Sequence, residues 1–270
     1  MIHLHQYIPA PLRNIVKSFW CLNVSTPACE AYQERIVPDG HHELIFHVKK
    51  KARRTDALQQ WHEEPAAIIA GQTTRSHELV LEDGALLYGI RFYPHTLAPL
   101  LRLPAAEYTN KLIGLNDVAY GSVFSHALNE SHALTFQHLE QLLVKMMKTA
   151  DYHSHSFQYI NYCVHQILAC NGLVKIDRLV ADLPISIRYL DQLFQRFVGL
   201  SPKMFCNQVR LQNYLHYKST FPHRTLTDCA YEAGYFDQAH ATRFFKTVTG
   251  ILPKDYFKTE HVINTHFAGM

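Results

Sequence analysis

The chain lacks the features that mark several large classes of protein. Charged residues make up only 18% of its 270 residues, and Gly and Pro number 11 and 12, which excludes a mostly disordered or collagen-like chain. Its apolar runs, such as 66–70 and 85–88, are far too short to span a bilayer. The N-terminal segment has no charged stretch followed by an apolar one, as a secretion signal would. We therefore expect a soluble, cytoplasmic protein with no membrane partner.

Motifs of the common enzyme classes are also missing. The sequence contains no G-x-S-x-G, no Walker loop and no dinucleotide fingerprint. Its cysteines include no C-x-x-C pair, so zinc-knuckle and thioredoxin-like sites lack their ligand spacing. The cysteines are Cys21, Cys29, Cys163, Cys170, Cys206 and Cys229. We expect reduced thiols in the core, no cofactor and no enzymatic activity.

What the chain does have is ample apolar material and an uneven distribution of charge. Hydrophobic residues at 47% and aromatic residues at 12% can form a sizeable core in one or two domains. Residues 156–258 hold 12 Lys or Arg against 7 Asp or Glu. Of the chain totals of 26 and 23, this leaves 14 against 16 elsewhere. A weakly acidic part followed by a basic part indicates two domains with different partners.

The first part of the chain has the short period of β-strands. The segments 41–48, 66–71, 76–84 and 85–94 are apolar runs ended by Gly, Pro or Asp. We expect a hairpin turn at Gly84–Ala85, between two of these runs. Closely spaced short strands predict a mainly β barrel or sandwich with some helices. The fold class is therefore α+β, with an all-α domain following.

A helix is predicted from about 132 to 149, with its apolar residues on one stripe. The stripe consists of Phe136, Leu139, Leu142, Leu143 and Met146. Such a stripe packs either on the sheet or on the same stripe of a second copy, so a homodimer is one of two alternatives. The polar segment 151–156 is the expected linker. The predicted domains are 1–150, which contains this stripe, and 157–260, followed by a tail at 261–270.

After the linker, two short helices recur twice around a long one. In the first unit Pro184 separates two helices, and Ser186 caps the second, which ends near Gly199. The layout returns about 50 residues later, with a stop at Gly234 and a cap at Asp237. Two short helices joined by a tight turn, the second with a polar outward face, are typical of a helix-turn-helix unit.

Between the units, residues 201–220 predict one long helix that begins with a Ser-Pro pair. Roughly 18 helical residues with a rise of about 1.5 Å each form a rod about 27 Å long. With the widths of the units added, its length approaches the one-turn repeat of B-DNA, about 34 Å. One chain can therefore place two recognition helices in successive major grooves.

The C-terminal motifs, in their order and spacing, resemble the DNA-binding domain of the AraC/XylS family of bacterial transcription regulators. They are G-L-S-P-x-x-F (199–205), R-L (210–211), A-Y-E-A-G-Y-F-D-Q-A-H (230–240), R-F-F-K (243–246) and T-G-I-L-P-K-D-Y (249–256). P-D-G-H-H-E-L-I-F-H (38–47), A-G-Q-T-T (70–74) and G-I-R-F-Y-P (89–94) look like the N-terminal domain of a poorly characterised AraC-type subgroup. The resemblance implies activation of transcription through contact with RNA polymerase.

Candidate DNA contacts lie on the outward faces of the two recognition helices. In the second unit they are Gln238, Ala239, His240, Thr242 and Arg243, and in the first unit Arg188, Tyr189 and Gln192. Gln suits adenine, and His and Arg suit guanine. The family pattern commonly has a basic residue where Gln192 stands, so weaker or more selective reading is expected from the first unit. Candidate phosphate contacts are Lys203, Arg210, Arg224, Lys246 and Lys254.

The N-terminal part offers candidates for an effector pocket. Arg91 stands in an apolar strand, where a buried guanidinium must pair with an acid of the protein or with a bound anion. His41, Glu43 and His47 share parity along one strand and form a weak divalent-metal set. A cupin-like metal site would need an H-x-H pair on this strand. The H-x-H pairs of the chain are His3/His5 and His153/His155, outside this strand, so we expect no metal. Arg91, His41 and Glu43 are the candidate effector residues.

These observations predict a sequence-specific DNA-binding transcription regulator, an activator that acts on double-stranded DNA and is modulated by a small effector bound in its N-terminal domain. Two alternatives stay open. One is a constitutive DNA-binding protein whose N-terminal domain only dimerises. The other is a metal-dependent enzyme that uses the N-terminal β domain.

Overall fold

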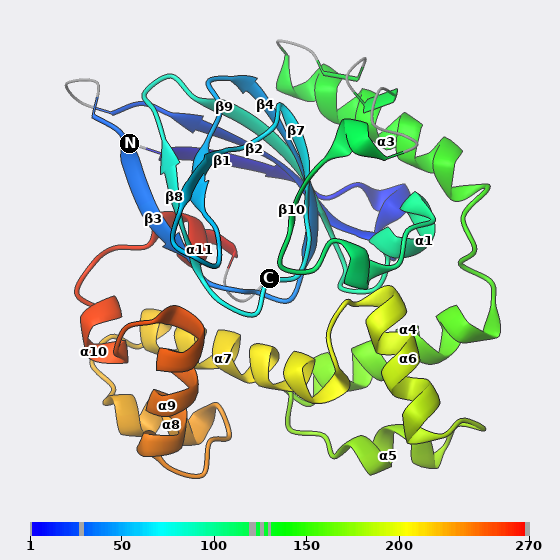
Figure 1. The fold of residues 1–270 in the computed structure, drawn as a ribbon, viewed down its shortest axis with the longest axis vertical. Helices are drawn as coiled ribbons and strands as arrows, with labels where there is room; N and C mark the ends of the chain where they lie inside the picture. The colour runs from blue at the N-terminus through cyan, green and yellow to red at the C-terminus, as the bar shows by residue number, and fades with distance from the viewer. Residues whose placement is uncertain (1, 27–29, 119–122, 125–126, 129–130, 268–270) are drawn as a thin grey trace.

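The computed structural model describes residues 2–26, 30–118, 123–124, 127–128 and 131–267. Two antiparallel β-sheets face each other in the N-terminal half, as predicted (Figure 1). The larger has the order β1 (Ile2–Tyr7), β2 (Val16–Val24), β9 (Leu86–Phe92), β4 (His42–Lys49), β7 (Ala67–Ala70) and β10 (Leu112–Gly114). The smaller has the order β3 (Tyr32–Ile36), β8 (His77–Leu81), β5 (Arg53–Thr55) and β6 (Trp61–Glu63).

Strand β9 lies in the middle of the core because both of its faces are covered. All seven of its residues are buried, which matches an apolar run without alternation. One face packs toward the smaller sheet together with Trp20 of β2, while Tyr88 and Ile90 belong to the cluster on the opposite face. Gly89 has no side chain where the indole of Trp20 crosses β9, and a Cβ there would overlap that ring.

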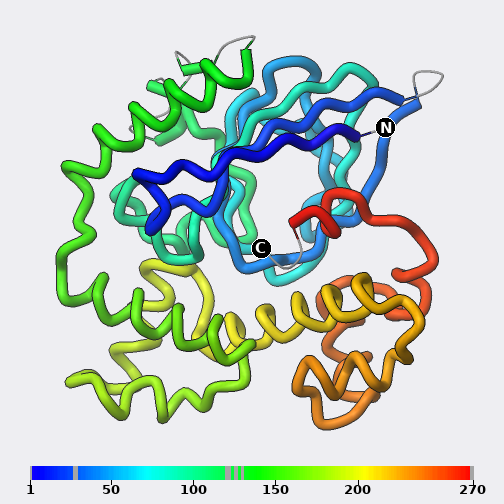
Figure 2. The backbone as a smooth tube through the Cα atoms, turned by 180° about the vertical axis from the view of Figure 1, so that it is seen from behind, coloured from blue at the N-terminus to red at the C-terminus, as the bar shows by residue number. Residues whose placement is uncertain are grey.

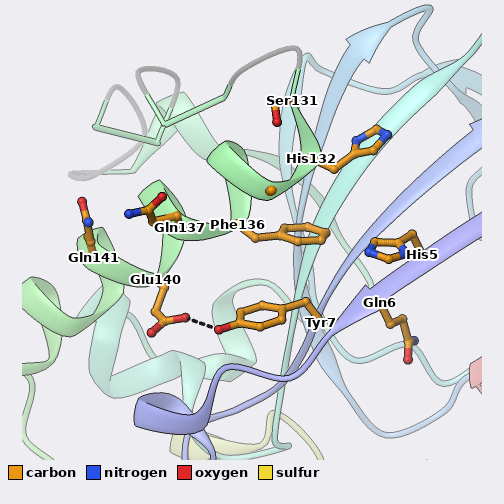
Figure 3. A pocket seen from close by; sticks show the side chains of 10 residues that line it. His5, Gln6, Tyr7, Ser131, His132, Phe136, Gln137, Glu140 and Gln141 are labelled. Atoms are coloured by element: carbon orange, nitrogen blue, oxygen red, sulfur yellow. Dashed lines mark hydrogen bonds between the residues drawn. The ribbon is translucent and has the colours of Figure 1, made fainter.

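Helix α3 (His132–Met147) covers the edge of the larger sheet at β1, above the 3-10 turn η1 (Ala10–Leu12). Figure 3 shows Phe136 projecting from α3 toward His5 and Tyr7 of β1. Its ring stacks 6.0 Å from that of Tyr7 and 5.9 Å from that of Phe19. The Tyr7 hydroxyl donates to Glu140 of α3 at 2.9 Å. Of the two alternatives for the apolar stripe, packing on the sheet is therefore the one that the structure contains.

The C-terminal half is all helical, and both predicted helix pairs are present. Its helices are α4 (His155–Ala169), α5 (Ile176–Ala181), α6 (Ile187–Phe197), α7 (Pro202–Thr220), α8 (Leu226–Glu232), α9 (Gln238–Thr249), α10 (Pro253–Tyr256) and α11 (Val262–Phe267). Short helices in the N-terminal half are α1 (Leu97–Leu101), η3 (Ala105–Glu107) and η4 (Leu115–Asp117). No helix in the described part of the chain has both the length and the apolar character needed to cross a bilayer.

The two halves share one continuous core. The cluster that begins under α1 and α3 continues through Phe157 and Ile160 of α4 into Leu190 and Phe194 of α6. Within the segment between α3 and α4, the Tyr152 hydroxyl donates to the Thr96 carbonyl at 2.8 Å. Four described cysteines are buried and Cys170 is exposed, all as free thiols. Cys29 lies outside the described residues.

The turn at Gly84 corrects one prediction. Gly84 has φ +77° and the Ala85 amide donates to the Glu82 carbonyl at 3.1 Å, so the tight turn exists. It is not a hairpin, because β8 belongs to the smaller sheet and β9 to the larger one. Turn chemistry fixes where the chain reverses, but it does not decide which strand the next segment pairs with. The turn therefore carries the chain from one sheet to the other.

The cap of α4 is a second, smaller correction. Ser156 lies two residues beyond the cap, because Ser154 is the cap and accepts from the Phe157 amide at 3.3 Å. Both serines occur in the sequence S-H-S, and either can start a helix. The difference shifts the start of α4 by two residues.

Replacing Gly89 should disrupt the centre of the core. We expect Gly89→Ala to lower the free energy of unfolding by about 1–3 kcal/mol, since the added methyl group forces the Trp20 indole to move. Urea unfolding of Gly89→Ala, Trp20→Leu and the double variant gives a double-mutant cycle. The two substitutions should couple favourably by at least 0.5 kcal/mol, and strictly additive costs would contradict the predicted overlap.

Candidate nucleic-acid interface and ligand cavity

Local sequence signals place the two recognition helices, α6 and α9. The Ser186 hydroxyl accepts from the Tyr189 amide at 3.2 Å at the start of α6. The Asp237 carboxylate accepts from the His240 amide at 2.6 Å at the start of α9. Gly234 follows the end of α8 and begins the turn to α9 with φ +75°, and a Cβ there would overlap the Leu173 side chain. Both caps are those that the sequence predicts.

The first half of α9 has an open face. Gln238, Ala239, His240 and Arg243 are exposed and Thr242 is half-buried, whereas Ala241, Phe245 and Val248 on the opposite face are buried. The side-chain Oε1 atom of Gln238 accepts from the Thr227 hydroxyl at 2.6 Å. The His240 ring lies edge-on to the Tyr235 ring, with 5.4 Å between the ring centres. The structure thus gathers the five predicted residues of the second unit on one helix start.

Helix α6 presents a similar face with one side chain engaged. Arg188 and Gln192 are exposed, and so is Asp191 between them. The Tyr189 hydroxyl is bonded to the Ser156 hydroxyl of α4 at 2.9 Å, and Tyr189 is 36% exposed. For Tyr189 to contact a base through its hydroxyl, the hydrogen bond between that hydroxyl and Ser156 must first break.

The five predicted phosphate contacts divide into two groups. Lys203, Lys246 and Lys254 are exposed, and Arg224 is paired with Glu232 at 3.1 Å on the surface. Arg210 is different, because its guanidinium donates to the Gly234 carbonyl at 2.6 Å and lies 4.4 Å from the centre of the Tyr235 ring. It stabilises the turn between α8 and α9, and a phosphate contact by Arg210 stays a prediction.

The connector α7 is a single helix of 19 residues, about 28 Å long at 1.5 Å per residue. The Ser201 hydroxyl caps it by accepting from the Met204 amide at 3.2 Å, and Pro202 is its first residue. In Figure 1, α7 runs between the unit of α5 and α6 and the unit of α8 and α9. The predicted rod between two helix pairs is therefore present.

Residues 179–259 match a family model described as a helix-turn-helix domain, which covers both units and α7. The C-terminal region is a helix-turn-helix domain of the AraC type. Residues 5–114, which hold both sheets, match a family described as a domain of unknown function (DUF6597). No curated protein matches the chain.

Three solved structures illustrate the likeness of the whole chain. ToxT from Vibrio cholerae O395 is 13% identical over 90% of this chain and 98% of that chain, with a TM-score of 0.48. Unsaturated fatty acid bound wild-type ToxT from Vibrio cholerae strain SCE256 is 12% identical over 95% and 94%, with a TM-score of 0.42. The AraC-like transcriptional activator CuxR is 12% identical over 72% and 74%, with a TM-score of 0.32.

The AraC-type domain is bonded to the N-terminal half through both of its units. Thr109 donates to the Gly199 carbonyl at 3.1 Å beside the first unit. At the end of α9, the Arg35 guanidinium donates to the Thr249 carbonyl at 2.9 Å, and the Ser76 amide donates to the Val248 carbonyl at 2.8 Å. The N-terminal half therefore holds the C-terminal end of α9, while the first half of that helix stays open.

The connector of the AraC-type domain is also attached to the N-terminal half. Gln212 of α7 donates to the Pro38 carbonyl at 2.7 Å, and Gln208 donates to the Thr73 carbonyl at 2.5 Å. The Val37 side chain is buried among Leu211, Tyr214 and Leu215 of α7. The segment after β3 is thus a major contact of the AraC-type domain.

A cavity of about 100 Å³ lies between the two sheets. Its lining is mostly apolar and comes from both sheets, α7 and α11, with Asp39, Glu43, Glu64 and Arg91 as its charged residues. Helix α11, which follows the AraC-type domain, returns to the N-terminal sheets (Figures 1 and 2). It contributes Ile263, Asn264 and Phe267 to the lining of the cavity. Residues of both sheets and of α11 therefore line the same cavity.

Arg91 is the charged centre of the cavity and is only 2% exposed. Its two terminal nitrogens donate to Glu43 at 2.6 Å and to Asp39 at 2.5 Å. The same guanidinium lies 3.3 Å from Nδ1 of His41, so the predicted trio of Arg91, His41 and Glu43 is together. Of the two alternatives for Arg91, the structure supplies acids of the protein as its partners.

The charges in this cluster follow from burial and from Arg91. Burial acts to lower the pKa of Arg91, but Asp39 and Glu43 outweigh it and raise that pKa. Burial, reinforced by Arg91 and Lys17, lowers the pKa of His41 well below its ordinary value, so the imidazole is neutral. Burial lowers the pKa of Lys17 to about 8 and Arg91 adds to this effect, while Asp39 opposes it. Lys17 lies 3.2 Å from the Nε2 atom of His41.

The candidate metal ligands do not form a metal site. His47 is paired with Glu64 at 2.9 Å, and Glu43 is held by Arg91. Among the described residues, no group of three His, Cys, Asp or Glu side chains is placed to hold a metal ion. A bulge near Val48 also breaks the strict alternation that the sequence suggests for this strand.

Sequence reasoning missed α11 and its partners. Phe267 places its ring 4.5 Å from the guanidinium carbon of Arg91 and 5.8 Å from the Trp20 ring. Asn264 is bonded to Glu34, to the Arg35 carbonyl and to the Val37 amide. The only signal in the sequence is a pair of apolar residues, Ile263 and Phe267, one helical turn apart.

Removing the guanidinium should leave the half-buried carboxylates of Asp39 and Glu43 without their cationic partner. We expect Arg91→Met to lower the free energy of unfolding by about 3–5 kcal/mol at pH 7. Burial raises the pKa of Glu43 and Arg91 opposes this, so without Arg91 the folded-state pKa of Glu43 should lie further above its unfolded value of about 4. The folded state then binds more protons than the unfolded state, so the loss should shrink as pH falls from 7 to 5.

Urea unfolding at pH 5 and pH 7 measures this loss. The matched control is Arg13→Met, since Arg13 is exposed and such a change should cost less than about 0.5 kcal/mol. A loss for Arg91→Met that is equal at both pH values would contradict the assigned pairing.

Proposed function

We propose that the chain is a sequence-specific transcription regulator that inserts α6 and α9 into successive major grooves of double-stranded DNA. The observation that carries this proposal is the open face at the start of α9. There Gln238, His240 and Arg243 stand exposed on a capped helix that follows a tight turn. Side chains at the start of a recognition helix are those that reach base edges.

The roles proposed for the side chains follow from their chemistry. His240 and Arg243 contact guanine, Gln238 contacts adenine, and Ala239 and Thr242 pack against the bases between them. On α6, Arg188 and Gln192 contact bases in the second major groove, and Tyr189 contacts the DNA beside them. Lys203, Arg224, Lys246 and Lys254 bind phosphates and set the register.

The N-terminal half is proposed to be the regulatory part. A small effector occupies the cavity between the sheets, where Arg91 and Glu43 line the wall and His41 lies behind them. The segment 34–39 supports this role, because it contributes to the cavity wall and also contacts α7 and α9. A ligand that shifts this segment changes how the second unit is presented to DNA.

The division of labour along the chain is proposed as follows. Residues 1–150 sense the effector and dimerise, 151–156 form the link, 157–260 bind DNA, and 261–270 form the tail. The output is activation through contact with RNA polymerase in the bacterial cytoplasm. The function is regulatory rather than enzymatic.

The base contacts can be tested on a site selected from a random-sequence DNA library. We expect His240→Ala and Arg243→Ala each to weaken binding to that site by about 1–3 kcal/mol, and to relax the choice of base at one position each. Titrations by fluorescence anisotropy measure the affinity. Arg13→Ala is the matched control, because this exposed arginine lies in the N-terminal half. If both α9 variants bind as tightly and as selectively as the parent, α9 does not read DNA.

The phosphate contacts make a different prediction. Lys203→Ala and Lys246→Ala should weaken binding to all sequences alike, and each should reduce the slope of log affinity against log salt by about 1. Salt titrations on the selected site and on a scrambled duplex measure both quantities. A loss confined to the selected site would instead indicate a base contact.

A further inference from the structure

Helix α11 occupies the cavity as a ligand would. It follows the AraC-type domain in sequence, yet its side chains lie in the core of the N-terminal sheets, with Ile263 9% and Phe267 8% exposed. The Phe267 ring is held between the Arg91 guanidinium and the Trp20 indole. A cation above a ring face and an edge-on indole are contacts that recognise an aromatic group.

The polar side of α11 is held by one buried carboxylate. Glu34 is only 3% exposed and accepts from the Ile263 amide at 2.8 Å, the Asn264 amide at 2.8 Å and the Asn264 side chain at 2.6 Å. If α11 leaves, Glu34 keeps the Tyr32 hydroxyl as a donor but loses the three N–H groups of α11. A carboxylate that is shielded from water without enough donors is costly, so a ligand that fills the place of α11 should bring N–H groups.

The space that remains beside α11 is too small for an effector. The residual cavity holds about 100 Å³, whereas sites for small ligands usually measure about 300–1,000 Å³. Binding in this cavity therefore requires that α11 withdraw. Ligand and helix compete for the same place.

The charges of the wall indicate the class of ligand. Both terminal nitrogens of Arg91 are already bonded to Asp39 and Glu43, and the wall carries Glu64 as a further acid. Arg54 and His47 are the partners of Glu64. A carboxylate ligand would find both terminal nitrogens of Arg91 occupied and only its Nε without a hydrogen-bond partner. It would also approach Asp39, Glu43 and Glu34 with a charge of the same sign.

We propose that α11 is an internal ligand of this cavity and that the effector is an aromatic amine that replaces it. The aromatic ring of the effector takes the place of Phe267 between Arg91 and Trp20. Its ammonium group takes the place of the α11 amides at Glu34. This inference rests on the proposed function, because it names the ligand and the regulation of the same cavity.

Two residues connect α11 to the recognition helix. The Arg35 carbonyl accepts from Asn264 at 2.7 Å, while the Arg35 guanidinium donates to the Thr249 carbonyl at the end of α9 at 2.9 Å. The Val37 amide donates to Asn264 at 2.9 Å, and the Val37 side chain is buried against α7. Withdrawal of α11 therefore removes bonds from two of the residues that hold the second unit, which loosens the attachment of α9 and allows it to adjust to DNA.

Competition can be measured with 4-phenylbutylamine as the probe and 4-phenylbutyrate as the matched anion. The chain has two tryptophans, so Trp61→Phe leaves Trp20 as the only indole and its fluorescence reports on the cavity. We expect the amine to bind at least tenfold more tightly when Phe267→Ala removes the competing ring, because affinity is reduced by the fraction of molecules in which the site is closed. The amine should bind more tightly than the acid in both proteins.

Two further variants sharpen the test. Glu34→Gln should abolish the preference for the amine over the acid, since it removes the negative charge. Leu58→Ala, which truncates a side chain 77% exposed on a loop, should leave the affinity for the amine unchanged. Equal affinity in the parent and in Phe267→Ala, or tighter binding of the acid, would overturn the proposal.

Hydrogen exchange in the unaltered chain tests the proposal even if Phe267→Ala fails to fold. Saturating 4-phenylbutylamine should speed exchange in the peptide that covers residues 262–267 by at least tenfold, because the Ile263 and Asn264 amides lose Glu34. Unchanged or slower exchange there, or absence of any binding, would overturn it. The DNA-binding titrations are independent: α9 variants with unaltered affinity reject the proposed function, while a failed competition rejects only the role of α11 and its ligand.

Discussion

The buried guanidinium of Arg91 is the interaction on which the N-terminal half depends. A charge that is 2% exposed must be paired, and Arg91 takes one partner from β4 and the other from the segment that joins β3 to β4. Asp39 is the partner in that segment, and Val37 and Pro38, just before it, contact α7. The ion pair therefore fixes the position of a segment that also contacts α7 of the AraC-type domain. Residues 37–39 thus connect the charged cluster of the cavity to the helix that carries the two DNA-binding units.

Local features predict the AraC-type domain almost completely. Ser186 and Asp237 cap α6 and α9 by accepting from an amide three residues ahead, and Gly234 ends α8 with φ +75°, a backbone conformation that favours glycine. Each of these effects operates within one or two helical turns, so the sequence displays its cause next to its result. The strands follow in the same way from short apolar runs. Local signals also explain why the residues at the start of α9 could be named in advance.

Contacts between distant segments could not be predicted in this way. The turn at Gly84 is visible in the sequence, but the pairing of β8 with β3 rather than β9 depends on side chains elsewhere in the two sheets. Arg210 looks like a free cation until the fold brings it to the Gly234 carbonyl. Helix α11 is the clearest case, since Ile263 meets Glu34 across 229 positions of the chain. Six residues with three apolar side chains do not specify a docking place by themselves.

The position of α11 also sets a thermodynamic relation between the two ends of the molecule. A ligand shifts an equilibrium only by its different affinity for the two states, and here the difference is built in, since the cavity is filled in one state and open in the other. Coupling of this kind is reciprocal. If withdrawal of α11 favours the arrangement that binds DNA, then DNA must favour withdrawal of α11 by the same factor. Arg35 links the two ends of this coupling, because it is hydrogen-bonded to both α11 and the end of α9. The strength of that coupling is bounded by what the bonds at Arg35 and Val37 contribute, on the order of 0.5–1.5 kcal/mol for each hydrogen bond, which suffices for a response of roughly tenfold.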